Sequence, residues 1–196
     1  MKLEELFEAP QNTFPQEFGL DEYEENIQRG KELLAEKNKI ALEQLGEYTL
    51  WEFKRKYALI RNEDSYIAYF MQFQFDMVPV INRKAVRQII VWRGNVTKYT
   101  QGLPTKIFRE YLLDRYGTVI TDMEQTADGK RFWSDRILQI LNDPRYKIYY
   151  LNYIHPRETI EITSSKQFEE ILRNKPAYGD ELKYQHRRFI LTNKPL

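Results

Sequence analysis

The sequence predicts an α/β protein with a mixed, mostly antiparallel sheet, two crossover helices and a helical N-terminal extension. Two observations lead to this prediction. Between residues 48 and 93 apolar and polar residues alternate, as in antiparallel strands with short connections. After residue 94 helical and strand patterns alternate, which is typical of crossover units. The 196 residues, 42% of them hydrophobic, are enough to bury the core of one such domain.

Composition and charge exclude several classes of protein. With 30 Lys and Arg against 29 Asp and Glu, the net charge of +1 gives no overall field that would attract nucleic acid or an anionic membrane. The absence of cysteine excludes disulfides and thiolate chemistry, and it is typical of a reducing compartment. The first residues carry acids where a signal peptide is basic, and no apolar run could span a bilayer. We therefore expect a cytoplasmic protein without a membrane segment.

Two regions are expected along the chain. Residues 1–46 should form a proline-bearing arm and a long helix, and residues 47–196 should form the α/β domain. The helix is expected to begin at Asp21, where Glu24 completes a pattern resembling a capping box, and to end at Gly46. Its apolar positions follow helical spacing and predict one buried stripe made of Tyr23, Ile27, Leu34, Ala41 and Leu45.

Three or four antiparallel strands should follow this helix. Residues 48–59 and 67–77 alternate between apolar and polar side chains, so we expect half-buried strands with one apolar face. A turn at residues 82–84 separates them from a further strand at residues 85–93. Connections this short favour a meander.

The next elements should form two crossover units. Pro104 suits the first turn of a helix with Ile107 and Phe108 on its buried side, and Gly117 should end that helix. A strand, a helix and a strand are then expected at residues 118–121, 131–141 and 146–152. Such crossovers join parallel neighbouring strands and are nearly always right-handed.

An insertion and a last strand complete the domain. The insertion should cover about residues 153–181 and contain a short helix, capped by Ser164 or Ser165, that buries Phe168, Ile171 and Leu172. The last strand is expected at residues 183–192, where apolar and basic residues mix.

This order of elements resembles the GNAT acetyltransferase fold over about residues 48–192, at the level of topology. In that fold the strands on either side of the first crossover helix lie parallel and splay apart. The resemblance therefore implies a cleft between strands 85–93 and 118–121. The chain is also similar to GNAT-like proteins of uncharacterised function from bacteriophages, in which an acidic-Gln-Thr-Gly turn precedes a helix that bears a Trp.

The resemblance implies acyl-coenzyme A as the cofactor, but the phosphate-binding motif is absent. GNAT proteins bind the pyrophosphate on a Gln/Arg-x-x-Gly-x-Gly/Ala turn at a helix start. Here VWRGNVTKYTQGLPT offers only Arg93, Gly94 and Gly102 at a different spacing, and Pro104 removes an amide. The cofactor is therefore left unassigned. The tyrosine that commonly acts as general acid in the family has no single counterpart, although Tyr146, Tyr149 and Tyr150 lie in the corresponding region.

Polar residues crowd the loop after the strand at residues 118–121, and they form the candidate site. Open α/β sheets place ligands at the carboxyl ends of their strands. We expect Arg93 to bind an anionic group, Asp122 to act as a base or an orienting carboxylate, and three residues to contact the substrate, namely Gln125, Thr126 and Trp133.

A purely structural interpretation of the same loop stays open. Asp122 and Thr126 could close an Asx-type turn, Asp128 could cap the following helix, and Arg93 could pair with Asp122. The two histidines, His155 and His186, lack metal-ligand spacing, so no metal site is expected.

Three functions are consistent with the sequence. An acyltransferase-like protein, catalytic or degenerate, is the first. A non-catalytic interaction protein, such as a phage accessory or virion component that docks a protein partner through its N-terminal arm and helix, is the second. A nucleic-acid-binding protein is the third, because basic residues interleave with aromatic ones around Arg83, Lys84, Arg87, Lys183, His186, Arg187 and Arg188.

Overall fold

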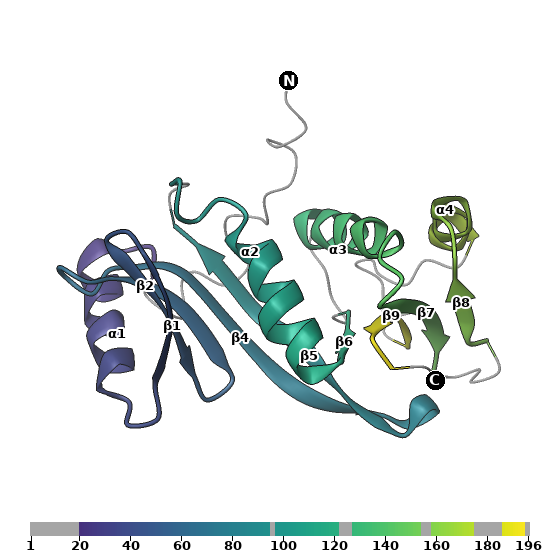
Figure 1. Cartoon of the computed structure of the whole chain (residues 1–196), viewed down its shortest axis with the longest axis horizontal. Coiled ribbons are helices and arrows are strands. Elements are labelled where there is room, and N and C mark those ends of the chain that lie inside the picture. The colour runs from purple at the N-terminus through teal and green to yellow at the C-terminus, as the bar shows by residue number, and fades with distance from the viewer. Residues whose placement is uncertain (1–19, 95–96, 122–126, 154–157, 175–185, 195–196) are drawn as a thin grey trace. The chain divides into compact units, whose positions relative to one another are not determined.

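The computed structural model describes residues 20–94, 97–121, 127–153, 158–174 and 186–194. These residues form an α/β protein with nine strands, in a mixed and mostly antiparallel arrangement, and four α-helices (Figure 1). They divide into two compact units. We call residues 20–74 with Gln88–Leu103 the N-terminal unit, and Phe75–Arg87 with the described residues from Pro104 onward the C-terminal unit.

The N-terminal unit is built on an antiparallel meander. Its strands are hydrogen-bonded in chain order. They are β1 (Ile40–Leu45), β2 (Tyr48–Phe53), β3 (Lys56–Arg61), β4 (Ile67–Val78) and β5 (Arg83–Arg93), of which β4 and β5 continue into the C-terminal unit. The strands expected at residues 67–77 and 85–93 are thereby confirmed. Residues 48–59, expected as one alternating stretch, are instead divided by a turn into β2 and β3.

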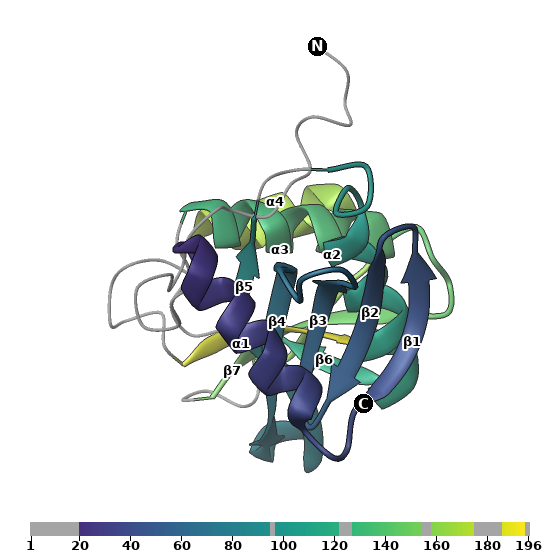
Figure 2. The ribbon, with the colours of Figure 1, turned by 90° about the vertical axis from the view of Figure 1, so that its left-hand side faces the viewer.

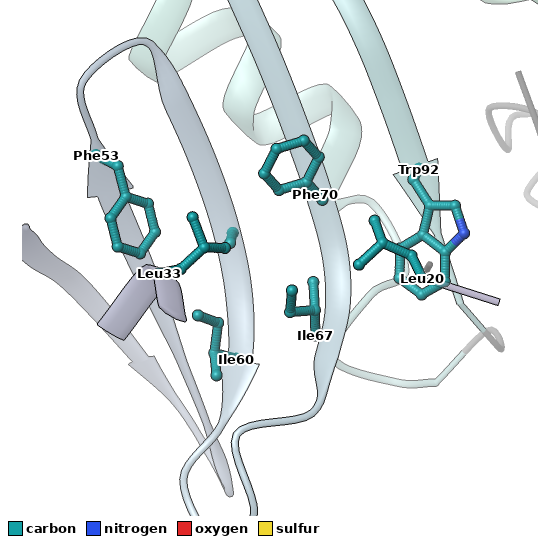
Figure 3. Close-up of a cluster of buried hydrophobic side chains, with 8 residues drawn as sticks. Leu20, Leu33, Phe53, Ile60, Ile67, Phe70 and Trp92 are labelled. Atoms are coloured by element: carbon teal, nitrogen blue, oxygen red, sulfur yellow. The ribbon is translucent and has the colours of Figure 1, made fainter. Parts of the chain in front are cut away.

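Helix α1 (Tyr23–Ala35) lies across this meander (Figure 2). The helix and the strands share one hydrophobic cluster, in which Leu33 of α1 and Leu20 meet side chains of the sheet (Figure 3). The strand residues labelled there are Phe53, Ile60, Ile67, Phe70 and Trp92. Burial of these large apolar side chains is the main force that holds α1 on the sheet.

The prediction that the helix continues to Gly46 is wrong. Helix α1 ends at Ala35, and residues 40–45 form β1, which pairs with β2. Gly46 lies in the turn between these strands with a φ of +60°, a conformation that favours glycine. The apolar residues at helical spacing beyond Ala35 therefore coincide by chance with a strand, because tertiary pairing with β2 outweighs a weak local pattern.

The buried stripe of α1 also differs from the predicted one. Asn26, Gly30 and Leu33 are its buried residues, whereas Tyr23 is 56% exposed. The helix begins after Glu22 without a side-chain cap, and the expected cap, Asp21, instead accepts a hydrogen bond from Trp92 Nε1 at 3.1 Å. The polar Asn26 and the small Gly30 were not recognisable as core residues from hydropathy.

The expectation of half-buried strands is wrong for β2 and β3. Four consecutive residues of β3, Tyr57 to Ile60, are at most 1% exposed, so side chains on both faces of this strand are covered. The turn after β4 also begins earlier than expected. It is a short 3₁₀ helix, η2 (Pro79–Ile81), closed by Asn82 in the left-handed conformation, and β5 begins directly at Arg83.

The C-terminal unit contains the crossover helices and the remaining strands, hydrogen-bonded in the order β4-β5-β6-β9-β7-β8. The expected helix between Pro104 and Gly117 is confirmed as α2 (Leu103–Lys106) and the π-helical segment η3 (Ile107–Asp114). The other elements are β6 (Thr118–Ile120), α3 (Ala127–Ile140), β7 (Lys147–Asn152), β8 (Ile160–Ile162), α4 (Ser165–Asn174) and β9 (Arg187–Thr192).

The first crossover joins parallel neighbours, as predicted. Strands β5 and β6 pair in parallel at Val86↔Val119 and Arg87↔Ile120. The second crossover does not join neighbours, because β9 lies between β6 and β7 and is antiparallel to both. The hydroxyl groups of Thr118 and Thr192, 3.0 Å apart, join β6 to this inserted strand.

The insertion contains the predicted helix, α4, and also β8, which was not predicted because three residues are too few to show a period. Ring contacts place α4 on the same face of the sheet as Phe189, whose ring centroid lies 5.3 Å from that of Phe168. Among the described residues, no helix has both the length and the apolar character needed to cross a membrane.

Candidate functional site

The predicted site residues are only partly described by the structure. Asp122, Gln125 and Thr126 lie outside the described residues. Arg93 ends β5 in the N-terminal unit and is 5% exposed. Trp133 lies in α3 and is 4% exposed, with its ring edge-to-face against Phe108 at 5.5 Å. The substrate contact expected of Trp133 stays a prediction.

The carboxyl end of β6 is fixed immediately before Asp122. Thr121 is fully buried; its backbone N–H donates to Phe189 O at 3.0 Å, and its Oγ1 accepts from Phe189 N at 3.0 Å. These two bonds tie the end of β6 to β9. Thr121 is therefore a fixed point at the carboxyl end of β6, and α/β proteins place ligand-binding groups at the carboxyl ends of their strands.

A buried amide and a carboxylate meet at the end of β7. Asn152 is 2% exposed, and its Nδ2 donates to Glu158 Oε2 at 2.9 Å. Glu158 belongs to the insertion, in the segment before β8. A hydrogen bond to a charged group in a buried setting is stronger than one at the surface, so this contact holds the insertion to the edge of the sheet.

Tyr150 lies two residues before Asn152, on the same face of β7. The side chain is fully buried, and among the described residues its hydroxyl has no hydrogen-bond partner. Burial raises the pKa of the Tyr150 hydroxyl, with the positive charge of Arg187 acting to lower it and the negative charge of Glu158 acting to raise it. The hydroxyl therefore stays protonated near neutral pH and can donate a hydrogen bond.

Two arginines of β9 place positive charge on both faces of the sheet, beside the end of β7. Arg187 is the register partner of Asn152, so it lies on the same face as Tyr150. Arg188 lies on the opposite face, is 3% exposed, and donates from Nη1 to Arg187 O at 2.7 Å. Burying a guanidinium is costly unless it is hydrogen-bonded, so Arg188 is a structural part of the edge.

On the face of the sheet opposite Tyr150, a group of charged side chains lies beside an apolar cluster. Arg87 and Asp76 form an ion pair at 2.6 Å between β5 and β4. Burial raises the pKa of Tyr153. The positive charges of Arg188 and Arg87 act to lower this pKa, and the negative charge of Asp76 acts to raise it. These charges therefore lie close together, next to the buried residues Val78, Ala85, Ile120, Tyr149, Leu151 and Ile190.

The described residues at this edge thus combine a tyrosine hydroxyl, an amide, a carboxylate and a guanidinium. We call Tyr150, Asn152, Glu158 and Arg187 the edge cluster. Asn152 and Glu158 were not among the site residues predicted from the sequence. Asn152 was detectable in principle, because a polar residue at the end of an otherwise apolar strand is unusual, whereas Glu158 is brought there only by the path of the insertion.

The loop after β5 lacks the pyrophosphate-binding motif, and most of its described amides have partners within the loop. Five of the described backbone N–H groups donate within the loop: Thr97 and Tyr99 to side-chain hydroxyls, and Thr100, Gln101 and Leu103 to carbonyls. Amides with internal partners are not available to an anion. A side chain at Gly94 would also meet the Tyr66 hydroxyl at 3.0 Å. These five amides are therefore not available to the diphosphate of coenzyme A.

The remaining candidates are placed as follows. His155 lies outside the described residues, and His186 lies just before β9, where its backbone O accepts from Tyr153 N at 2.8 Å. No cluster of three or more metal-ligating side chains occurs in the part of the chain that the structure describes. Of the basic residues considered for nucleic acid, Arg87 is ion-paired and Arg188 is buried, and Lys183 lies outside the described residues.

The fold and the edge cluster define a class: an α/β protein with a mixed sheet and polar groups at the carboxyl ends of its crossover strands. A particular family is not identified. Neither family models, curated proteins nor solved structures gave a match to this chain.

Proposed function

We propose that this chain is an acyltransferase-like protein of GNAT-like topology, with its site at the carboxyl end of β6 in the C-terminal unit. The observation that carries the proposal is the parallel pair β5 and β6, joined through the single crossover of α2 and η3. That pairing is what the GNAT resemblance requires. If no pair of parallel strands had been present, the proposal of a GNAT-like topology would have had no support.

The proposed roles follow from residue chemistry. Asp122, directly after the buried Thr121, is the proposed base or orienting carboxylate, and Gln125, Thr126 and Trp133 are the proposed substrate contacts. The anionic-group role expected of Arg93, which lies in the N-terminal unit, stays a prediction. The edge cluster supports the proposal, because a protonated hydroxyl and a carboxylate at the end of a sheet are groups that acyl transfer can use.

The acyl donor of this proposal is a thioester other than coenzyme A. The internally bonded amides of residues 97, 99–101 and 103 support this, because they are not available to a diphosphate. A thioester needs amides of this kind only if it carries a nucleotide. The proposed donor class is therefore an acyl thioester without a nucleotide phosphate, and S-acetylpantetheine is the simplest representative.

The test measures thiol release from S-acetylpantetheine and, separately, from acetyl-coenzyme A, in the presence of a panel of amines. The full chain is compared with Asp122→Asn, which removes the charge and keeps the size of the side chain. We expect thiol release from S-acetylpantetheine that falls at least about tenfold in Asp122→Asn, equivalent to about 1.4 kcal/mol. Asp143→Asn, in an Arg-paired turn remote from β6 in sequence, serves as the control with unchanged turnover.

Two results would count against the proposal. If no thioester is consumed above the uncatalysed rate by a folded protein, the interaction-protein alternative is favoured. If Asp122→Asn turns over at the wild-type rate, Asp122 is a turn residue and the site assignment fails. A melting curve of each variant separates loss of activity from loss of folding.

A further inference from the structure

Basic side chains gather at one end of the meander in the N-terminal unit. Strands β1 and β2 pair as far as Ile40↔Glu52, so the loop that leads from α1 into β1 runs beside the turn after β2. That turn joins β2 to β3 and consists of Lys54 and Arg55. Helix α1 separates this end of the unit from Leu20, where the first described segment begins.

Glu36 joins the loop to the turn. Lys56, the first residue of β3, donates from Nζ to Glu36 Oε1 at 2.8 Å, and Lys39 Nζ donates to Glu36 O at 3.4 Å. Side chains of the two connections are therefore held next to one another. We give the name basic tip to Lys37, Lys39, Lys54, Arg55 and Lys56.

The basic tip places an excess of positive charge at the surface. Lys37, Lys54 and Arg55 are exposed. Two carboxylates belong to the same end of the unit: Glu36 is ion-paired within the tip, and Glu52, directly before the end of β2, is only 9% exposed. The positive charges of the tip therefore outnumber these carboxylates.

Arg55 occupies a backbone position that suits glycine. Its φ is +63°, and the second residue of a two-residue turn with positive φ is usually Gly or Asn. A larger side chain at such a position costs free energy, and here it places a guanidinium at the turn. Residues held in this conformation cluster where function requires the side chain.

Stabilisation of α1 accounts for part of the basic tip. Positive charge is favourable after the end of a helix, which is where the loop lysines lie, and Lys56 neutralises Glu36. Neither reason applies to Lys54 and Arg55, because they lie in the turn between two strands. A ligand of opposite charge explains why this turn carries two cations.

We propose that the basic tip binds the phosphate backbone of double-stranded nucleic acid, independently of base sequence. Closely spaced cations complement a duplex, which carries one negative charge for about every 1.7 Å of its axis. Residues 36–39 and the turn are all charged or polar, and the exposed Asn38 adds a hydrogen-bond donor. A lipid surface would favour apolar or aromatic side chains in these connections, and a single strand would favour aromatic rings on which its bases stack.

This surface differs from the basic residues that the sequence alone suggested for nucleic acid. Those residues lie at positions 83–87 and 183–188, whereas the basic tip belongs to the loop after α1 and the turn after β2. The proposed acyltransferase site is in the C-terminal unit, so either proposal can fail without the other.

The test follows the fluorescence anisotropy of a fluorescein-labelled DNA duplex of about 20 base pairs and mixed sequence, titrated with the full chain at about 50 and about 200 mM KCl. We expect a dissociation constant on the order of 10 µM at the lower salt concentration. For three phosphate contacts, binding should be about 40-fold weaker at the higher one.

The double variant Lys54→Gln with Arg55→Gln removes the two cations of the turn. We expect it to bind the duplex at least about tenfold more weakly at the lower salt concentration, with the salt slope reduced by about two. The double variant Lys31→Gln with Lys98→Gln is the matched control, because it removes the same charge at exposed positions outside the basic tip. Its affinity should equal that of the wild type.

Single substitutions of Arg55 separate binding from folding. Arg55→Gly removes the cation and suits the positive φ, so we expect weaker binding of the duplex without a lower melting temperature. Arg55→Lys keeps the charge and should keep most of the affinity. If the Lys54 and Arg55 double variant is unfolded by circular dichroism, Arg55→Gly decides the comparison.

Three results would overturn the proposal. The first is a folded wild-type protein that does not bind the duplex at the lower salt concentration. The second is equal affinity of the turn variants and the matched control. The third is binding to vesicles of phosphatidylcholine and phosphatidylserine with no binding to the duplex, which would assign the basic tip to a membrane surface.

Discussion

The side-chain amide of Asn26 pairs with the backbone of Ile67 in both directions. Asn26 Nδ2 donates to Ile67 O at 3.1 Å, and Ile67 N donates to Asn26 Oδ1 at 2.7 Å. A third bond runs from Nδ2 to Leu20 O at 2.9 Å. Asn26 is fully buried, so a single side chain of α1 satisfies the first residue of β4 and the segment that leads into the helix.

Replacement of Asn26 by Ala should be among the most damaging substitutions in α1. It leaves the N–H and C=O of Ile67 buried without their partner, which costs about 3 kcal/mol in the free energy of unfolding. Urea unfolding at pH 7 measures this loss. Gln28→Ala, at an exposed position of the same helix, should change the free energy by less than about 0.5 kcal/mol. Equal effects of the two substitutions would show that the Asn26 bonds add little.

Gly30→Ala should destabilise the protein although alanine favours helices. In an open helix this change stabilises by up to about 1 kcal/mol. Here an added Cβ would lie 1.8 Å from Ser65 O, a backbone atom that can move only with its loop. We expect a net loss of about 1–3 kcal/mol, measured by urea unfolding, against no change for Lys31→Ala at the neighbouring exposed position. A more stable Gly30→Ala variant would mean that α1 packs further from Ser65.

The ion pair of Arg61 and Asp64 should make stability depend on acid pH. Arg61 Nε and Nη2 donate to the two carboxylate oxygens of Asp64 at 2.9 and 2.6 Å. These bonds hold the pKa of Asp64 well below its usual value. The stabilisation is therefore fully present above the unfolded-state pKa, near about 3.9, and is lost as the pH falls below it towards the folded-state value.

Asp64→Asn checks this dependence. At pH 7 we expect it to be less stable than the wild type by about 1 kcal/mol, because both side chains are partly exposed. The difference should shrink when urea unfolding is repeated at about pH 3. Glu63→Gln, at the exposed neighbouring position, should match the wild type at both pH values. A difference that grows on acidification would contradict the assigned direction of the pKa.

Tyr146→Phe should lower stability, whereas Tyr150→Phe should not. The Tyr150 hydroxyl is buried and has no hydrogen-bond partner among the described residues, whereas the Tyr146 hydroxyl donates to Asp114. Removing the first should leave stability unchanged or raise it by up to about 1 kcal/mol, and removing the second should lower it by about 1 kcal/mol. Melting temperatures give the comparison. If Tyr150→Phe is clearly destabilised, an ordered water or an unobserved group binds the hydroxyl.

Acetyl-coenzyme A should bind weakly or not at all. The glycine-rich phosphate turn is absent from the sequence, and the loop amides of residues 97, 99–101 and 103 are bonded internally. Isothermal titration calorimetry with acetyl-coenzyme A and with free acetate as a reference checks this. A dissociation constant near 1 µM, about −8 kcal/mol, would show that the phosphates are held by another arrangement.

The sequence by itself determined most elements of the second half. Pro104 and Gly117 mark the limits of one helix, and Ser164 marks the start of another, because proline, positive-φ glycine and capping serine act through local backbone geometry. The parallel pairing of β5 and β6 was also predictable, since one crossover helix allows little else.

Other features were decided only by the tertiary structure. Residues 40–45 follow helical spacing, yet pairing with β2 makes them a strand, because many hydrogen bonds and shared burial outweigh a local pattern. The position of β9 between β6 and β7 joins segments far apart in the chain, and no local signal encodes such pairing.

The candidate site divides in the same way. The sequence nominated Asp122, Gln125 and Thr126 by the polarity of a loop after a β-branched strand, and those nominations stay predictions. Asn152 and Glu158 became candidates only because the folded chain brings the insertion back to the end of β7. A site within one loop can be predicted from the sequence because it depends on residues that are neighbours in the chain. A site assembled from separate segments exists only once long-range contacts have formed.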